Sequence, residues 1–93
     1  IAGTRELDEQ EEQLIRSTSV RLIGADEMRA GKRLEEQVER LAANTAAILL
    51  HVDLAVLDPR LVPSSSTPSE NGLDLPAAVA AMQTVLATGK VAV

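Results

Sequence analysis

The stretch from residue 31 to residue 44 carries the clearest helical pattern of apolar and polar positions in the chain. Its charged side chains fall on one face, and its apolar side chains recur at the spacing that places them on a single stripe of an α-helix. The pattern therefore predicts an amphipathic helix that begins near Gly31 and ends by Asn44. The apolar stripe consists of Leu34, Val38, Leu41 and Ala42.

Two further helices are predicted from their capping signals. Asp8 is followed three residues later by Glu11, as in a capping box, and acidic residues crowd the first turn, where the helix dipole favours them. Leu14 and Ile15 are expected to be the buried residues of this first helix.

The last helix is expected to start at Asp74, with Pro76 tolerated in its first turn. Gly89 would end this helix, because glycine readily adopts the backbone conformation that closes a helix. Its inner side would carry Val79, Met82 and Leu86.

Four apolar segments are predicted as strands. Residues 1–4 resemble the end of a strand, and residues 20–23 are short, β-branched and followed by glycine. Residues 46–57 form a nearly unbroken apolar run, which is typical of a strand buried on both faces of a parallel sheet. Residues 91–93 look like the beginning of another strand, so the chain is expected to be a piece of a longer protein.

The resulting order is strand, helix, strand, helix, strand, loop, helix, strand. Alternation of this kind predicts an α/β fold with a doubly wound parallel sheet and right-handed crossovers. The portion present would be β-α-β-α-β-α-β, and residues 1–93 would form a single partial domain. Without its neighbouring strands, such a sheet would expose its edges and an apolar face, so association is expected.

Composition excludes several function classes. The chain contains no Phe, Tyr or Trp, so no aromatic ring is available to stack on a base, and its net charge of −5 repels phosphate backbones and anionic membranes. Cysteine is absent, which excludes disulfides and thiolate metal ligands. No apolar run approaches the roughly 20 residues of a membrane span. We therefore expect no nucleic-acid or membrane partner, and a cytoplasmic location.

Candidate chemistry lies at the end of the apolar run and in the loop after it, because ligands in open α/β sheets bind beyond the carboxyl ends of the strands. Asp53 lies within the apolar run, where a carboxylate is costly unless it is paired or bound to a cation. Asp58 precedes a proline, and the simplest interpretation is a turn that leaves the strand. Residues 58–72 are rich in Pro and Ser, and a loop of this length is usually functional.

The spacing of residues in this segment resembles a signature of the arginase, agmatinase and formimidoylglutamase family. That pattern reads Ser-x-Asp-x-Asp, three residues, Pro, three residues, Pro, a small residue, and Gly after seven more. The matching positions are Asp53, Pro59, Pro63, Ser64 and Gly72. Upstream, Gly3-Thr4-Arg5 with Leu7-Asp8 is similar to the family's Gly-x-Arg-x-x-Asp motif, so the resemblance covers essentially the whole chain.

The resemblance implies a three-layer, arginase-like α/β fold and a hydrolase that acts on the C–N bond of a small guanidino or amidino compound. It also implies a site for two manganese ions, which activate water, and a homo-oligomer as the assembled protein. By position, Asp53 would be a metal ligand, while Thr67 and Glu70 would contact the substrate.

Two positions depart from the family pattern. The second Asp of the Asp-x-Asp pair is Ala55, which cannot coordinate a metal, so one ion site should be weakened or lost. The first position is His51, which would share a strand face with Asp53 and is a possible ligand, although a histidine hydrogen-bonded near the strand is the favoured interpretation. The family's histidine-bearing motifs are not in this chain, so we expect the chain alone to be inactive.

Three hypotheses follow from the sequence. The chain is a fragment of an active ureohydrolase, or part of a catalytically impaired member of that family, or a small non-enzymatic α/β interaction module. The first two are favoured, and the substrate among arginine-like compounds stays open.

Overall fold

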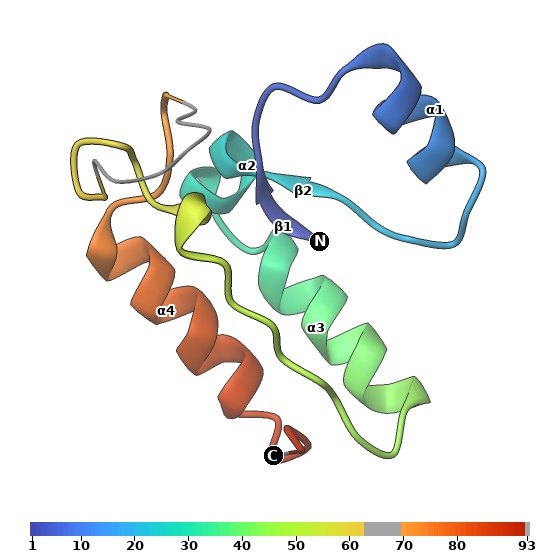
Figure 1. Ribbon diagram of the computed structural model, residues 1–93. Helices are drawn as coiled ribbons and strands as arrows, with labels where there is room; N and C mark the ends of the chain where they lie inside the picture. The colour runs from blue at the N-terminus through green and yellow to red at the C-terminus, as the bar shows by residue number, and fades with distance from the viewer. Residues whose placement is uncertain (63–69, 93) are drawn as a thin grey trace.

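The computed structural model of the protein describes residues 1–62 and 70–92, whose helices surround a few short extended segments (Figure 1). Its helices and strands, in chain order, are β1 (Ala2–Thr4), α1 (Glu9–Arg16), β2 (Ile23–Gly24), α2 (Ala25–Ala30), α3 (Arg33–Asn44), the 3-10 turn η1 (Leu54–Val56) and α4 (Leu75–Leu86).

Every strand pairing among the described residues is parallel. β1 pairs with β2 through Ala2 and Ile23, and isolated parallel bridges join Ile48 to Val91 and Leu57 to Leu73. Helices lie between β1 and β2 and between Ile48 and Val91, and these parallel pairings constitute a partial α/β fold, as the alternation of elements predicted.

The predicted caps are confirmed at two helices. Asp8 accepts a hydrogen bond from the backbone N–H of Glu11, and the Glu11 side chain accepts one from the backbone N–H of Asp8, so the capping box is complete. Asp74 caps α4 by accepting a hydrogen bond from the N–H of Ala77 at 2.9 Å. Helix α3 lies within the range predicted from its apolar stripe.

The prediction of a long buried strand over residues 46–57 is wrong. Among the described residues of this segment, only Ile48 and Leu57 form a β-bridge, and each bridge is isolated. The 3-10 turn η1 begins directly after Asp53. Among the described residues, no backbone hydrogen bond joins residues 49–52 to another segment. A strand exists only where a neighbour accepts its backbone hydrogen bonds, and the apolar pattern cannot supply that neighbour.

Burial also differs from the sequence-based expectation. The buried apolar residues are few and mostly small or β-branched, whereas Leu14 is 68% exposed and Leu86 is 55% exposed. Helix α1 buries none of its residues, and it stands apart from the other helices in Figure 1. Helix α2, which the sequence did not predict, brings Ala25 into the core. The core consists of Ile23, Ala25, Val38, Ile48, Leu73 and Ala78.

The carboxyl ends of the extended segments converge. β1 and the segment that leads to η1 run in the same direction, with α3 and α4 on either side of that segment (Figure 1). No helix in the described part of the chain is long and apolar enough to cross a membrane.

Candidate functional site

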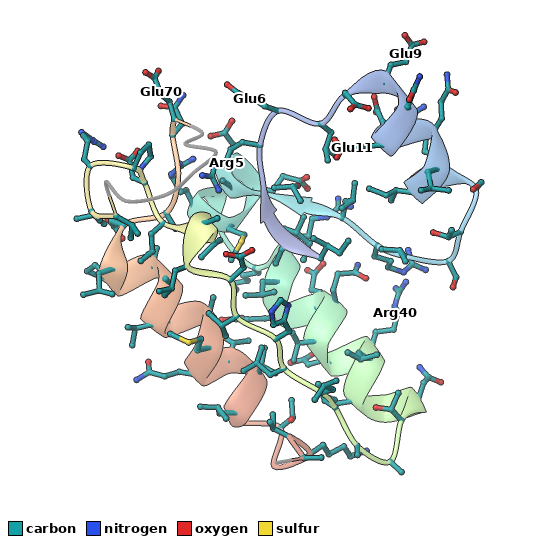
Figure 2. All side chains as sticks on the ribbon, in the orientation of Figure 1. Arg5, Glu6, Glu9, Glu11, Arg40 and Glu70 are labelled. Carbon is teal, nitrogen blue, oxygen red and sulfur yellow. The ribbon has the colours of Figure 1, made fainter. Side chains whose placement is uncertain are left out.

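Arg5, which follows β1, ties the end of this strand to η1. Its Nη1 donates hydrogen bonds to the carbonyl oxygens of Gly3 at 3.1 Å and Val56 at 3.3 Å. Its Nη2 donates to the carbonyl of Ala55 at 3.0 Å. Figure 2 shows Arg5 beside the end of β1, near the turn. The guanidinium therefore fixes the position of the turn that contains the Asp-x-Asp region of the sequence pattern.

Gly3 makes this close approach possible. Its φ of +85° is a left-handed conformation, and a Cβ at this position would lie 2.3 Å from Cγ2 of Val56. Any larger residue would push η1 away from β1, because atoms at that separation overlap. The glycine of the Gly-x-Arg motif thus has a steric role at the candidate site.

Asp53 precedes η1 and caps it. Its Oδ1 accepts a hydrogen bond from the N–H of Ala55 at 2.8 Å, while its own backbone is extended. A carboxylate can accept further partners on its second oxygen, and Asp53 is exposed. Asp53 is therefore accessible to a cation, although part of its hydrogen-bonding capacity holds the turn.

The 3-10 turn changes the relation between positions 53 and 55. Side chains two residues apart share a face on a strand, but they diverge in a turn with about three residues per revolution. Ala55 is exposed, and its methyl group offers no ligand atom. Positions 53 and 55 therefore do not share a strand face in this structure, because Ala55 lies within η1.

The described residues do not fit a two-manganese site by themselves. In residues 1–62 and 70–92, no group of three or more His, Cys, Asp or Glu side chains is arranged to hold a metal ion. His51 is exposed, on the same segment as Asp53. Manganese requires several oxygen or nitrogen ligands, so Asp53 and His51 alone are too few.

Asp58 organises the start of the loop that follows. Its N–H donates to the carbonyl of Leu73 at 3.0 Å, and its Oδ1 accepts hydrogen bonds from the backbone N–H of Arg60 at 3.1 Å and from Nε of Arg60 at 2.6 Å. The carboxylate is almost fully buried, while the Arg60 side chain is exposed. The hydrogen bond from the Arg60 side chain lowers the pKa of Asp58 below its ordinary value.

Gly72 and Arg29 hold the other end of the same loop. A Cβ at position 72 would lie 2.4 Å from the backbone nitrogen of Asp58, so only glycine allows the two ends of the loop to touch. Nη2 of Arg29 donates to the carbonyl of Gly72 at 3.0 Å and also to the carbonyl of Asn71. The sequence did not identify Arg29, because residues 25–30 carry no pattern that predicts a helix there.

A polar pocket of ≈ 480 Å³ lies between these loop ends and α2. Glu70 is exposed at the edge of this loop (Figure 2). The side-chain hydrogen bond to Asp58 is the main cause that raises the pKa of Arg60, and the charge of Glu70 adds to the same shift. Thr67, the other predicted substrate contact, lies outside the described residues. The pocket lining consists of Arg29, Asp58, Arg60, Leu61, Asn71, Gly72 and Asp74.

Solved structures of arginases share this fold. The arginase from Bacillus caldovelox is 30% identical with a TM-score of 0.86, and the match covers 97% of this chain and 31% of that one. The arginase from Bacillus cereus is 27% identical with a TM-score of 0.78, covering 97% and 32%. Helicobacter pylori arginase, 20% identical with a TM-score of 0.85, supports the fold alone. A comparison with curated proteins finds no match.

The fold is part of a parallel α/β protein, and the candidate site lies at the carboxyl ends of its strands. The sequence matches the model of the Arginase family over residues 1–93. The chain therefore belongs to the arginase family, and it spans about a third of the length of the arginases whose structures it matches.

Proposed function

We propose that this chain is one part of a ureohydrolase that hydrolyses a C–N bond in a small guanidino or amidino compound. The observation that carries the proposal is the family match over the whole chain. The chain corresponds to only a third of an arginase, so the activity is assigned to the full protein that contains it and not to the 93 residues alone.

Within that protein, we assign Asp53 to the metal site and the loop containing Thr67 and Glu70 to the side that meets the substrate. The exposure of Asp53 and the fixed position of η1 support the assignment of Asp53. Glu70 offers an exposed carboxylate, which suits a cationic substrate. Two manganese ions and a homo-oligomeric assembly complete the proposal.

The contribution of Asp53 can be tested in the full protein by replacing it with Asn, which keeps the turn-capping oxygen but removes the charge. We expect Asp53→Asn to lower both manganese content and hydrolysis of arginine, agmatine or formiminoglutamate by at least about tenfold. Glu9→Gln, an exposed change on α1, is the matched control and should leave both unchanged. Equal manganese content in the Asp53→Asn and unmodified proteins would remove Asp53 from the metal site.

A catalytically impaired member of the family is the second candidate, and Ala55 is the observation that favours it. This residue stands where the family pattern has a carboxylate, and it has no side-chain ligand atom. If the full protein binds less than two manganese ions and the Ala55→Asp variant binds more, the impaired form is favoured. The family match removes the third hypothesis, a module without hydrolase ancestry.

A further inference from the structure

Asn71 and Gly72 form the one Asn-Gly pair of the sequence. An asparagine loses its side-chain amide most readily before glycine, because glycine has no Cβ to shield its backbone nitrogen or to limit its rotation. The other asparagine of the chain, Asn44, precedes the β-branched Thr45, which hinders the same reaction. Asn71 is exposed, so its side chain is accessible to water, the co-reactant that the reaction needs.

Deamidation at this pair joins the backbone of Gly72 to the side chain of Asn71. The backbone nitrogen of Gly72 gives its proton to hydroxide and attacks Cγ of Asn71. The new N–Cγ bond closes a succinimide ring, and the Cγ–Nδ2 bond breaks as Nδ2 takes up a proton and leaves as ammonia. Water then opens the ring. Cleavage at Cγ leaves aspartate, and cleavage at the backbone carbonyl carbon leaves isoaspartate, which lengthens the main chain by a methylene group.

The backbone of Asn71 has a conformation that does not allow this ring to close. Its φ of +60° lies in the left-handed region, which residues other than glycine adopt rarely. The usual ψ of that region is about +47°, and it directs the next backbone nitrogen away from Cβ. The nitrogen of Gly72 therefore reaches Cγ of Asn71 only after the backbone at Asn71 rotates.

Contacts on both residues of the pair oppose that rotation. Nη2 of Arg29 donates hydrogen bonds to the carbonyl oxygen of Asn71 and, at 3.0 Å, to that of Gly72. The backbone of Asp58 packs directly against Gly72, since a Cβ at position 72 would lie 2.4 Å from the nitrogen of Asp58. The peptide bond between Asn71 and Gly72 is thus held by a side chain from α2 and by the other end of the loop.

Asp58 also opposes ionisation of the attacking nitrogen. The pKa of Asp58 is lowered mainly by the hydrogen bond from the Arg60 side chain, and a hydrogen bond from the N–H of Gly72 adds to the same shift. This N–H therefore faces a carboxylate that is almost fully buried. A nearby negative charge disfavours a second negative charge, so the proton that the reaction must remove is retained on the Gly72 nitrogen.

We propose that Asn71–Gly72 is a latent deamidation site, which the contacts of Arg29 and Asp58 keep unreactive in the folded protein and which reacts when those contacts open. Either product adds a carboxylate beside Asp58 and Asp74, which already line the polar pocket. In isoaspartate, the added methylene group lies where Gly72 packs against Asp58, so the two ends of the loop cannot return to the same contact. Deamidation therefore makes the opening permanent. The proposal does not depend on the hydrolase activity proposed above.

The test uses the full protein that contains this sequence, incubated at mildly alkaline pH in the folded state and in urea. Peptide mapping by mass spectrometry follows the conversion of Asn71 to aspartate and isoaspartate. We expect conversion to be at least about tenfold faster in urea, because unfolding removes the hydrogen bonds from Arg29. Asn44 is the internal control and should stay unconverted in both states. Equal rates at Asn71 in the two states, or no conversion even in urea, would overturn the proposal.

A variant of Arg29 separates the effect of its contacts from that of global unfolding. Arg29→Lys keeps the charge but cannot reproduce the hydrogen bonds of the guanidinium, and it should speed conversion in the folded protein about tenfold. Arg33→Lys is the matched control, because Arg33 pairs with Glu27, and it should leave the rate unchanged. Slower conversion in Arg29→Lys would mean that Arg29 promotes the reaction by polarising the carbonyl of Asn71, and it would contradict the proposal.

Hydrogen exchange gives a second measurement on the unmodified protein, which applies even if Arg29→Lys does not fold. In urea concentrations below the unfolding transition, conversion at Asn71 should rise in proportion to the exchange rate of the Gly72 amide. Faster exchange of this amide without faster conversion would show that opening of these contacts does not control the reaction. Hydrolase activity does not enter either measurement, so the two proposals fail separately.

Discussion

Nη2 of Arg5 donates a hydrogen bond to the carbonyl oxygen of Ala55 at 3.0 Å, across 50 positions of the sequence. The arginine thereby links the end of β1 to the residue that stands where the family pattern has a second carboxylate. The backbone at position 55 is thus held in place although its side chain offers no metal ligand.

Replacement of Arg5 by Lys should lower the free energy of unfolding by about 1–3 kcal/mol. A lysine has a single charged nitrogen and cannot reproduce the fork that reaches Gly3, Ala55 and Val56 together. Urea unfolding followed by circular dichroism measures the change. Arg21→Lys, at an exposed arginine, is the control and should be nearly neutral. Equal free energies of unfolding for the two variants would show that the Arg5 hydrogen bonds to Gly3, Ala55 and Val56 do not stabilise the fold.

Gly72→Ala should destabilise the protein by about 2–4 kcal/mol, because the added Cβ would overlap the backbone of Asp58 and separate the two ends of the loop. Gly24→Ala makes the same chemical change where the nearest atom is 3.7 Å away, and it should cost much less. Thermal unfolding of both variants compares them. A smaller loss for Gly72→Ala than for Gly24→Ala would contradict the close approach at Asp58.

The stability of the loop closure should depend on acid pH through Asp58. Its pKa is lowered in the folded protein by the hydrogen bond from the Arg60 side chain, so the stabilisation is fully present above the pKa of the unfolded state, about 3.9. It is lost as the pH falls through the lower folded-state pKa. Arg60→Ala should raise the pKa of Asp58 in an NMR titration, and Arg33→Ala should not. An unchanged Asp58 pKa in Arg60→Ala would contradict this cause.

Asp8→Ala should unfold α1 locally without changing global stability. The variant removes the capping box, which is worth about 1 kcal/mol, but α1 buries no residue and so contributes little to the core. Amide exchange of residues 9–16 should become faster, while the urea midpoint stays constant. Gln10→Ala serves as the control on the same helix. A large shift of the urea midpoint in Asp8→Ala would mean that α1 packs more firmly than the structure indicates.

The sequence predicted those features that depend on neighbouring residues along the chain. The Asp8–Glu11 capping box and the Asp74 cap were predicted correctly, because their donors and acceptors lie within one helical turn. The order of elements also identified the fold class, and the spacing from Asp53 to Gly72 identified the family.

Features that depend on distant partners were missed. The apolar run 46–57 has the composition of a buried central strand, but a strand also needs neighbours on its edges, and residues 49–52 have none among the described residues. Burial also requires a distant partner: Leu14 and Leu86 lie on helices, and they are exposed because no other described segment covers them. Arg29 was missed because its contacts to Asn71 and Gly72 arise only when α2 packs against the loop.

The central claim is that this chain forms one part of a ureohydrolase. The most direct measurement is hydrolysis of arginine, agmatine and formiminoglutamate with manganese, comparing the full protein that contains this sequence with the isolated 93-residue chain. We predict that the full protein hydrolyses one of these compounds in a manganese-dependent way and that the isolated chain hydrolyses none. Absence of hydrolysis by the manganese-loaded full protein would contradict the claim and would favour the second candidate, a catalytically impaired member of the family.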